Sequence, residues 1–136
     1  MHMDLYAENI LDHYRSPRDK KKLLNPTVEH GEVNHACGDV LTLQITIDGD
    51  VITDLGWNGT GCAISQAAMS LLAEDLKGKT ISQVATFRPQ DIYDLLGVPI
   101  SPRRLKCALL CLHALKNALH ILKGEKIQNW SETANG

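Results

Sequence analysis

The sequence predicts an α+β fold, in which a small antiparallel β-sheet is packed on one side by helices within a single domain. Three observations support this prediction. The chain has 136 residues, which is the size of one ordinary domain. Apolar and polar residues alternate cleanly from Val40 to Asp48, as in a half-buried strand. Apolar residues also recur at helical spacing before and after this strand, which places helices on both sides of it in the chain.

The first predicted helix runs from Leu5 to Tyr14, with Asp4 as its N-cap and Pro17 ending it. The basic run at 18–22 is interpreted as a solvated loop. A short strand is expected over Val28–Val33.

The central feature is a β-hairpin. The strand at Val40–Asp48 is followed by Asp48-Gly49-Asp50, a hairpin turn signal, and by a return strand at Val51–Trp57. Cys37 therefore lies at the mouth of a strand whose partner runs back toward the same end. The glycine-rich stretch 58–62 is expected to form an unusual turn after the return strand.

Helices fill the rest of the predicted domain. Gly78 is expected to end the first of them, and Ser101 and Pro102 are expected to begin the last. The predicted ranges are Ala63–Lys77, Thr80–Thr86, Pro89–Leu96 and Pro102–Leu122. The domain is expected to cover residues 1–124, and residues 125–136 are predicted to be a polar, disordered tail.

Composition and charge exclude several classes of protein. The formal net charge is -2, with 14 basic and 16 acidic residues, which argues against nucleic acid as the main partner. No apolar run approaches the length of a membrane helix, and no secretory signal is visible, so we expect no membrane partner and a cytoplasmic location. In that setting, the four cysteines are expected to bind metal or to react as thiols.

Three of the cysteines have unusual flanks. Cys37 is followed by glycine and then by Asp39, a second metal-ligand residue type. Cys62 begins a predicted helix, where the helix dipole favours a thiolate. Cys107 follows two arginines and a lysine. Successive members of this set are 25 and 45 residues apart, so their spacing alone is a weak metal-site signal. A lone cysteine is commonly a small buried apolar residue. That interpretation is kept for Cys111, which lies on an apolar helical stripe.

Four stretches resemble the iron–sulfur scaffold family that comprises IscU, SufU and the N-terminal domain of NifU. Three are the cysteine motifs His35-Ala36-Cys37-Gly38-Asp39, Gly59-Thr60-Gly61-Cys62-Ala63-Ile64-Ser65 and Arg103-Arg104-Leu105-Lys106-Cys107-Ala108. The fourth is the opening helix, from Tyr6 to Arg18. The resemblance extends over nearly the whole chain to about Leu122, and the family's small antiparallel sheet packed by helices agrees with the predicted fold.

The resemblance implies a site and a function. Cys37, Cys62 and Cys107 match the family's three ligand thiols, and Asp39 matches the aspartate that contacts the metal or tunes cluster release. Such proteins take sulfur from a cysteine desulfurase, transiently hold a [2Fe–2S] cluster and pass it to apo iron–sulfur acceptor proteins. Several members hold Zn²⁺ at the same site, and Zn²⁺ is expected in the purified protein. We expect a monomer or a weak homo-oligomer.

The sequence departs from the IscU pattern at several positions. Lys106 precedes the third cysteine, as in SufU-like members, where IscU-type members have histidine; its charge is expected to favour the Cys107 thiolate. The Leu-Pro-Pro-Val-Lys signal to the chaperone is replaced by residues 100–104, yet the insertion typical of SufU is absent. His35 stands where the family has proline; it is interpreted as an exposed loop histidine, with a spare ligand as the alternative.

Three hypotheses follow. The first is a cluster-assembly scaffold without turnover of its own, with Cys37 as the candidate sulfur acceptor and Cys107 as the second choice. Asp39 would make its site release a cluster readily, because carboxylate suits iron–sulfur less well than thiolate. The second is a zinc-dependent sulfur acceptor, a sulfurtransferase of the SufU type, since three thiolates and a carboxylate also satisfy tetrahedral Zn²⁺. The third is an unrelated domain with a structural zinc.

Overall fold

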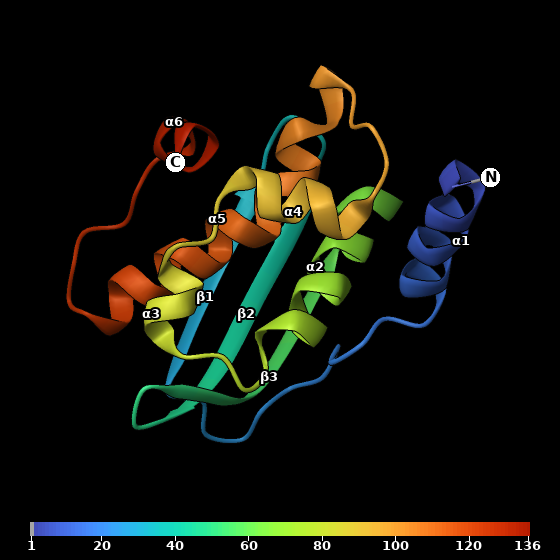
Figure 1. The fold of residues 1–136 in the computed structure, drawn as a ribbon. Coiled ribbons are helices and arrows are strands. Elements are labelled where there is room, and N and C mark those ends of the chain that lie inside the picture. Colours follow the sequence, from blue (N-terminus) through green and yellow to red (C-terminus); the bar gives the residue numbers. More distant parts are fainter. Residues whose placement is uncertain (1) are drawn as a thin grey trace.

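A computed structural model describes the backbone of residues 2–136 and the side chains from residue 7 onward. The chain forms a three-stranded antiparallel sheet in the order β1-β2-β3, with helices over one face (Figure 1). The strands are β1 (Val28–Asn34), β2 (Asp39–Asp48) and β3 (Val51–Thr60). The predicted α+β class, the antiparallel sheet and the packing of helices against it are therefore confirmed.

The strand register sets the geometry at one end of the sheet. β1 and β2 pair from Val28 opposite Ile45 to Asn34 opposite Asp39, and β3 extends to Thr60 opposite Val40. The predicted turn at residues 58–62 is thus too long, because Gly59 is still a strand residue paired with Leu41. A side chain at Gly59 would meet the Val40 carbonyl oxygen, so the close approach of two strands requires glycine here.

Two helices form the core against the sheet. They are α2 (Ala63–Leu76) and α5 (Leu105–Leu122), which contact each other, with α5 lying on β1 and β2. Most of the alternating apolar residues of β2 are buried: Leu43 and Ile45 have no exposed surface, whereas Ile47 is partly buried. We expected no apolar run of membrane-spanning length, but the segment Pro102–Leu122 is long and apolar enough by composition to cross a membrane. In the fold, 67% of its most apolar stretch is buried. The segment is apolar because α5 packs in the core.

The first helix docks on α2. It is α1 (His2–Arg15), at the outer side of α2 in Figure 1, and the predicted cap and apolar positions at residues 4–6 lie outside the described side chains. His13 is buried on this contact: its Nδ1 lies 2.7 Å from Ser70 Oγ, and its Nε2 lies 3.3 Å from a Glu74 carboxylate oxygen. The loop that follows is attached to β3, because the Arg18 carbonyl accepts a 2.8 Å hydrogen bond from the Trp57 indole.

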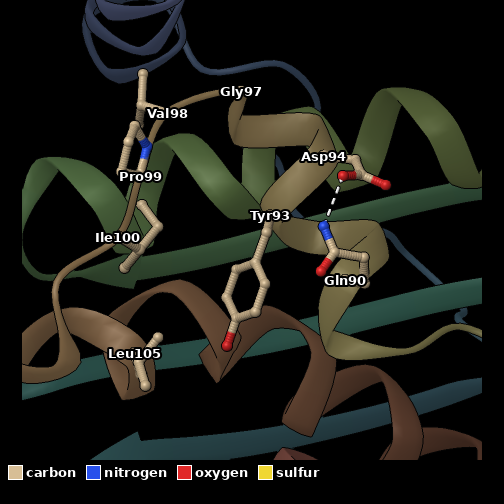
Figure 2. Close-up of a pocket in the computed structure, with 8 residues that line it drawn as sticks. All are labelled: Gln90, Tyr93, Asp94, Gly97, Val98, Pro99, Ile100 and Leu105. Carbon is tan, nitrogen blue, oxygen red and sulfur yellow. Dashed lines mark hydrogen bonds between the residues drawn. The ribbon is translucent and has the colours of Figure 1, made fainter.

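Two short helices connect α2 to α5. They are α3 (Ile81–Ala85), which has the predicted Thr80 cap, and α4 (Pro89–Leu96), which has the predicted bounds. A short 3₁₀ turn, η1 (Pro102–Arg104), precedes α5, and Ser101 makes no side-chain cap bond there. A pocket lies between α4 and the linker at 97–101, with Tyr93 at its centre and Gln90 bonded to Asp94 beside it (Figure 2). None of the predicted site residues lines this pocket.

The prediction of a disordered tail is wrong. Residues 130–135 form α6 (Trp130–Asn135), which begins with a capping box made by Asn129 and Glu132 and lies near the edge of the molecule opposite α1 (Figure 1). The Trp130 ring stacks on the His113 imidazole, with centroids 4.2 Å apart, and Thr133 Oγ1 lies 2.6 Å from His113 Nδ1. A polar sequence hid this helix because its anchoring partners are on α5.

Candidate metal centre

The β1–β2 loop presents the first motif. Residues 35–38 join the paired residues Asn34 and Asp39, and Gly38 has a φ of 71°, a left-handed conformation that suits glycine. Cys37 is exposed on this loop, whereas Asp39 is only 1% exposed at the start of β2. The loop therefore puts an accessible thiol beside a buried carboxylate.

The other two cysteines come from helix beginnings. Cys62 is the N-cap of α2, as predicted, and its side chain makes no cap bond. Cys107 lies in the first turn of α5 and has no exposed surface. Both helices begin at the end of the sheet that carries the β1–β2 loop. For α2 this follows because it begins only two residues after Thr60, the last residue of β3. For α5 it follows because Cys107 in its first turn lies 3.4 Å from Cys37 of the loop.

Three predicted ligands are close together. Potential ligand atoms of Cys37, Asp39 and Cys107 all lie within 4.8 Å of one another, and the Cys37 and Cys107 sulfurs are 3.4 Å apart. Cys62 reaches the group through its backbone, since its N–H donates a 3.0 Å hydrogen bond to Asp39 Oδ1. The geometry thus unites the three sequence motifs, while the direct coordination of metal by all four residues stays a prediction.

The Asp39 carboxylate is held on both oxygens. Besides the Cys62 N–H, Oδ1 accepts a long 3.4 Å hydrogen bond from the Ser65 hydroxyl, and Oδ2 accepts a 3.1 Å bond from the Asn34 amide. A Cβ at Gly61 would lie against Asp39 Oδ1 and 2.7 Å from Ser65 Oγ. Glycine at position 61 therefore leaves space that the carboxylate fills.

Sequence reasoning missed Asn34 and Ser65. The Asn34 amide also lies 3.7 Å from the Cys107 sulfur, so this residue contacts two of the candidate ligands. The sequence contains one indication of the role of Asn34: if β1 and β2 pair as a hairpin with a four-residue loop, Asn34 lies opposite Asp39. This pairing could not be predicted, because β1 lacks a clean alternation of apolar and polar residues.

Burial and neighbouring groups act on the Cys107 thiol. Burial raises its pKa strongly, and hydrogen bonding to Cys37, Asp39 and Cys62 raises it further. The Lys106 ammonium lies 5.8 Å from the centre of the Trp130 ring of α6, a cation–π arrangement. The predicted role of Lys106 in favouring the Cys107 thiolate stays a prediction.

The remaining candidates are separate from the group. Cys111 is 1% exposed, and burial raises the pKa of its thiol to about 12, as expected for an unreactive core residue. His35 is exposed on the loop, in agreement with the interpretation as a loop histidine. The accessible side of the site is a cavity lined by the following residues: Ala36, Cys37, Cys62, Ser101, Arg103 and Arg104.

The donor set suits a metal ion. Thiols and a carboxylate are ligands that tetrahedral Zn²⁺ accepts, and Zn–S bonds of about 2.3 Å place two sulfurs on one ion roughly 3.8 Å apart. The observed 3.4 Å separation of the Cys37 and Cys107 sulfurs is close to that value. Fold and site together define a small α+β protein with a thiol-rich metal-binding centre at one end of its sheet.

Comparison with known proteins identifies the family. Residues 5–129 match the NifU-like N terminal domain, and the chain belongs to that family. It is 35% identical over 132 residues to the zinc-dependent sulfurtransferase SufU of Bacillus subtilis, covering 85% of this chain and 89% of the relative. It is 34% identical over 125 residues to the iron–sulfur cluster assembly scaffold protein IscU of Azotobacter vinelandii, covering 89% of this chain and 96% of the relative.

A solved structure shares the fold. It is a putative iron–sulfur cluster assembly scaffold protein for the SUF system from Fervidobacterium islandicum, with a TM-score of 0.75 and 29% identity. The match covers 88% of this chain and 99% of that structure. The family resemblance found in the cysteine motifs is therefore confirmed over the whole domain.

Proposed function

We propose that the protein is an iron–sulfur cluster assembly scaffold. It accepts sulfur from a cysteine desulfurase in the cytoplasm and transiently holds a [2Fe–2S] cluster at Cys37, Asp39, Cys62 and Cys107, as a monomer or weak homo-oligomer. The observation that carries this proposal is the convergence of three sequence motifs on one group, with ligand atoms within 4.8 Å. The relatives named as scaffolds and as a sulfurtransferase support the same two activities.

Cys37 is the sulfur acceptor in this proposal because it is the exposed thiol of the close group. Its thiolate attacks the outer sulfur of the persulfide on the desulfurase. A new sulfur–sulfur bond forms on Cys37, the bond within the original persulfide breaks, and the electron pair leaves with the desulfurase cysteine as a thiolate. The buried Cys107 is less accessible to such a partner.

The cluster is cargo, and the ligand set suits its release. Thiolates bind iron–sulfur clusters firmly, whereas the carboxylate of Asp39 is a harder and weaker ligand. A cluster with two irons also needs ligand pairs that are further apart than those of a single ion. The proposal assigns this adjustment to the loop at 35–38, where Gly38 has a φ of 71° and no atom of the described residues lies within 4 Å of a Cβ placed on it.

The second candidate is a zinc-dependent sulfurtransferase. The 3.4 Å separation of the Cys37 and Cys107 sulfurs favours it, because this spacing suits two ligands on one ion. A Zn²⁺ ion held by Cys62, Cys107 and Asp39 would also bind Cys37 and keep that ligand as a thiolate. Acceptance of the sulfur then follows the same exchange, and the protein passes it on without building a cluster.

Reconstitution separates these candidates. The protein is incubated anaerobically with a cysteine desulfurase, iron and cysteine; cluster formation is followed by visible circular dichroism, and transfer to an apo-ferredoxin by its activity. A transferable cluster supports the scaffold. Sulfur uptake by the zinc form without a cluster supports the sulfurtransferase. If the protein shows neither activity, a structural zinc site is the remaining hypothesis. Cys37→Ser is expected to lose sulfur uptake, while Cys111→Ala serves as the matched control.

A further inference from the structure

The buried amide of Asn34 lies between two candidate ligands. Asn34 is 1% exposed and is the last residue of β1. Its Nδ2 lies 3.1 Å from Asp39 Oδ2 and 3.7 Å from Cys107 Sγ. We propose that Asn34 is a positioning residue of the metal centre, which orients the Asp39 carboxylate toward the thiols and donates a hydrogen bond to the Cys107 sulfur.

The chemistry of an amide fits this role. The side-chain NH₂ group has two donor hydrogens, so it can serve a carboxylate and a sulfur together. A hydrogen bond to a carboxylate is charge-assisted and orients it more firmly than a neutral one would. Because the Asn34 amide is neutral and its NH₂ group faces the ligands, it adds no charge repulsion to the donor set.

Two firm donors fix how the carboxylate lies. The Cys62 N–H holds Oδ1 from the start of α2, and Asn34 holds Oδ2 from β1. The Ser65 hydroxyl lies 3.4 Å from Oδ1, but its one proton has a shorter 3.0 Å bond to the Cys62 carbonyl oxygen. A carboxylate offers about four lone-pair positions, so positions remain free for a metal ion. Without Asn34, Oδ2 would lose its partner and the Asp39 side chain would be free to turn away from the thiols.

The inference rests on the proposed metal site. If Asn34 positions the ligands, its removal should lower the affinity of the protein for metal ions. Removing a hydrogen-bond partner of a metal ligand typically costs about 10–100-fold in metal affinity. We expect Asn34→Ala to bind Co²⁺ and Zn²⁺ about 10–100-fold more weakly than the native protein. The thiolate-to-cobalt charge-transfer band should persist, while the d–d bands change because the carboxylate is replaced by water.

Asn117→Ala is the matched control. Asn117, like Asn34, is a buried asparagine, but it lies on α5. Its amide donates to Glu32 and to the Gln128 carbonyl, away from the thiols. Its removal is expected to lower the melting temperature and to leave the cobalt spectrum and metal affinity of the folded protein unchanged. If the alanine variant does not fold, Asn34→Leu is used for the same comparison, because leucine has the same branched side-chain skeleton, though a larger volume, and no donor.

The measurement is titration of reduced, metal-free protein with Co²⁺, followed by competition with Zn²⁺ and a chelator. Weaker binding and altered d–d bands in the Asn34 variant alone support the inference. Native affinity and spectrum in that variant, or equal changes in Asn117→Ala, would overturn it. Sulfur uptake from the desulfurase is measured separately on the native protein; its failure would refute the proposed function without touching the role of Asn34.

Discussion

Substitution of Gly61 by alanine tests whether the position of the Asp39 carboxylate depends on close packing. The new Cβ would lie against Asp39 Oδ1, 2.7 Å from Ser65 Oγ and 3.0 Å from Asp39 Cγ. Such contacts are too short, so the carboxylate must shift. We expect the shift to break at least one of its shorter hydrogen bonds, which come from the Cys62 N–H at 3.0 Å and from Asn34 at 3.1 Å.

The structure gives a magnitude for this change. A hydrogen bond to a charged group contributes about 1.5–3 kcal/mol to the free energy of unfolding, so loss of one such bond by the buried carboxylate should lower the stability by that amount. For a domain of this size, the melting temperature should fall by roughly 5–12 °C. A displaced carboxylate is also a poorer ligand, so metal affinity should fall by about 10–100-fold.

Thermal unfolding of the reduced, metal-free protein measures the first effect, and chelator competition measures the second. Gly31→Ala on β1 is the control for an added methyl group, because a Cβ there makes only ordinary contacts, the closest 3.5 Å from Thr42 Oγ1. The φ of 157° at Gly61 also strains any other residue, so the metal affinity is the readout that reports on the carboxylate itself. The control should change neither quantity appreciably. A Gly61→Ala protein with native stability and native metal affinity would refute the argument that Asp39 needs the space at position 61.

Three further predictions concern other parts of the molecule. Cys111→Ala should leave metal content intact, and Cys111 should resist alkylation until the protein unfolds; loss of metal from the folded variant would add this residue to the site. Asp39→Cys should supply a fourth thiolate, so that a reconstituted cluster leaves for an apo-acceptor more slowly; equal transfer rates from fully loaded proteins would show that Asp39 does not control release. Burial lowers the pKa of His13 and of His113 in the folded protein. Both therefore stabilise the fold above their unfolded pKa of about 6.5, and this stability is lost as the pH falls through their folded values. Urea unfolding at a series of pH values should show this acid loss, and His113→Gln should reduce it; an unchanged pH profile in that variant would exclude His113 as a contributor.

Local chemistry was sufficient to predict most elements. The alternation in β2, the Asp48-Gly49-Asp50 turn and the Thr80 cap each depend on interactions between near neighbours in the chain, so each is visible in the sequence. Residues 125–136 were misjudged because α6 is anchored by the contact of Trp130 with His113, two residues far apart in the chain. Such a contact leaves no periodic pattern in a short polar segment.

The metal-ligand residue types could be recognised from the sequence: three cysteines with unusual flanks and one aspartate. Their arrangement in space depends on the folded structure. The pairing of Asn34 with Asp39 in the sheet brings a buried amide to the carboxylate, and the start of α5 brings Cys107 within 3.4 Å of Cys37. Register and helix packing are set by burial summed over the whole core, so no single motif contains the information that places Cys37, Asp39 and Cys107 together.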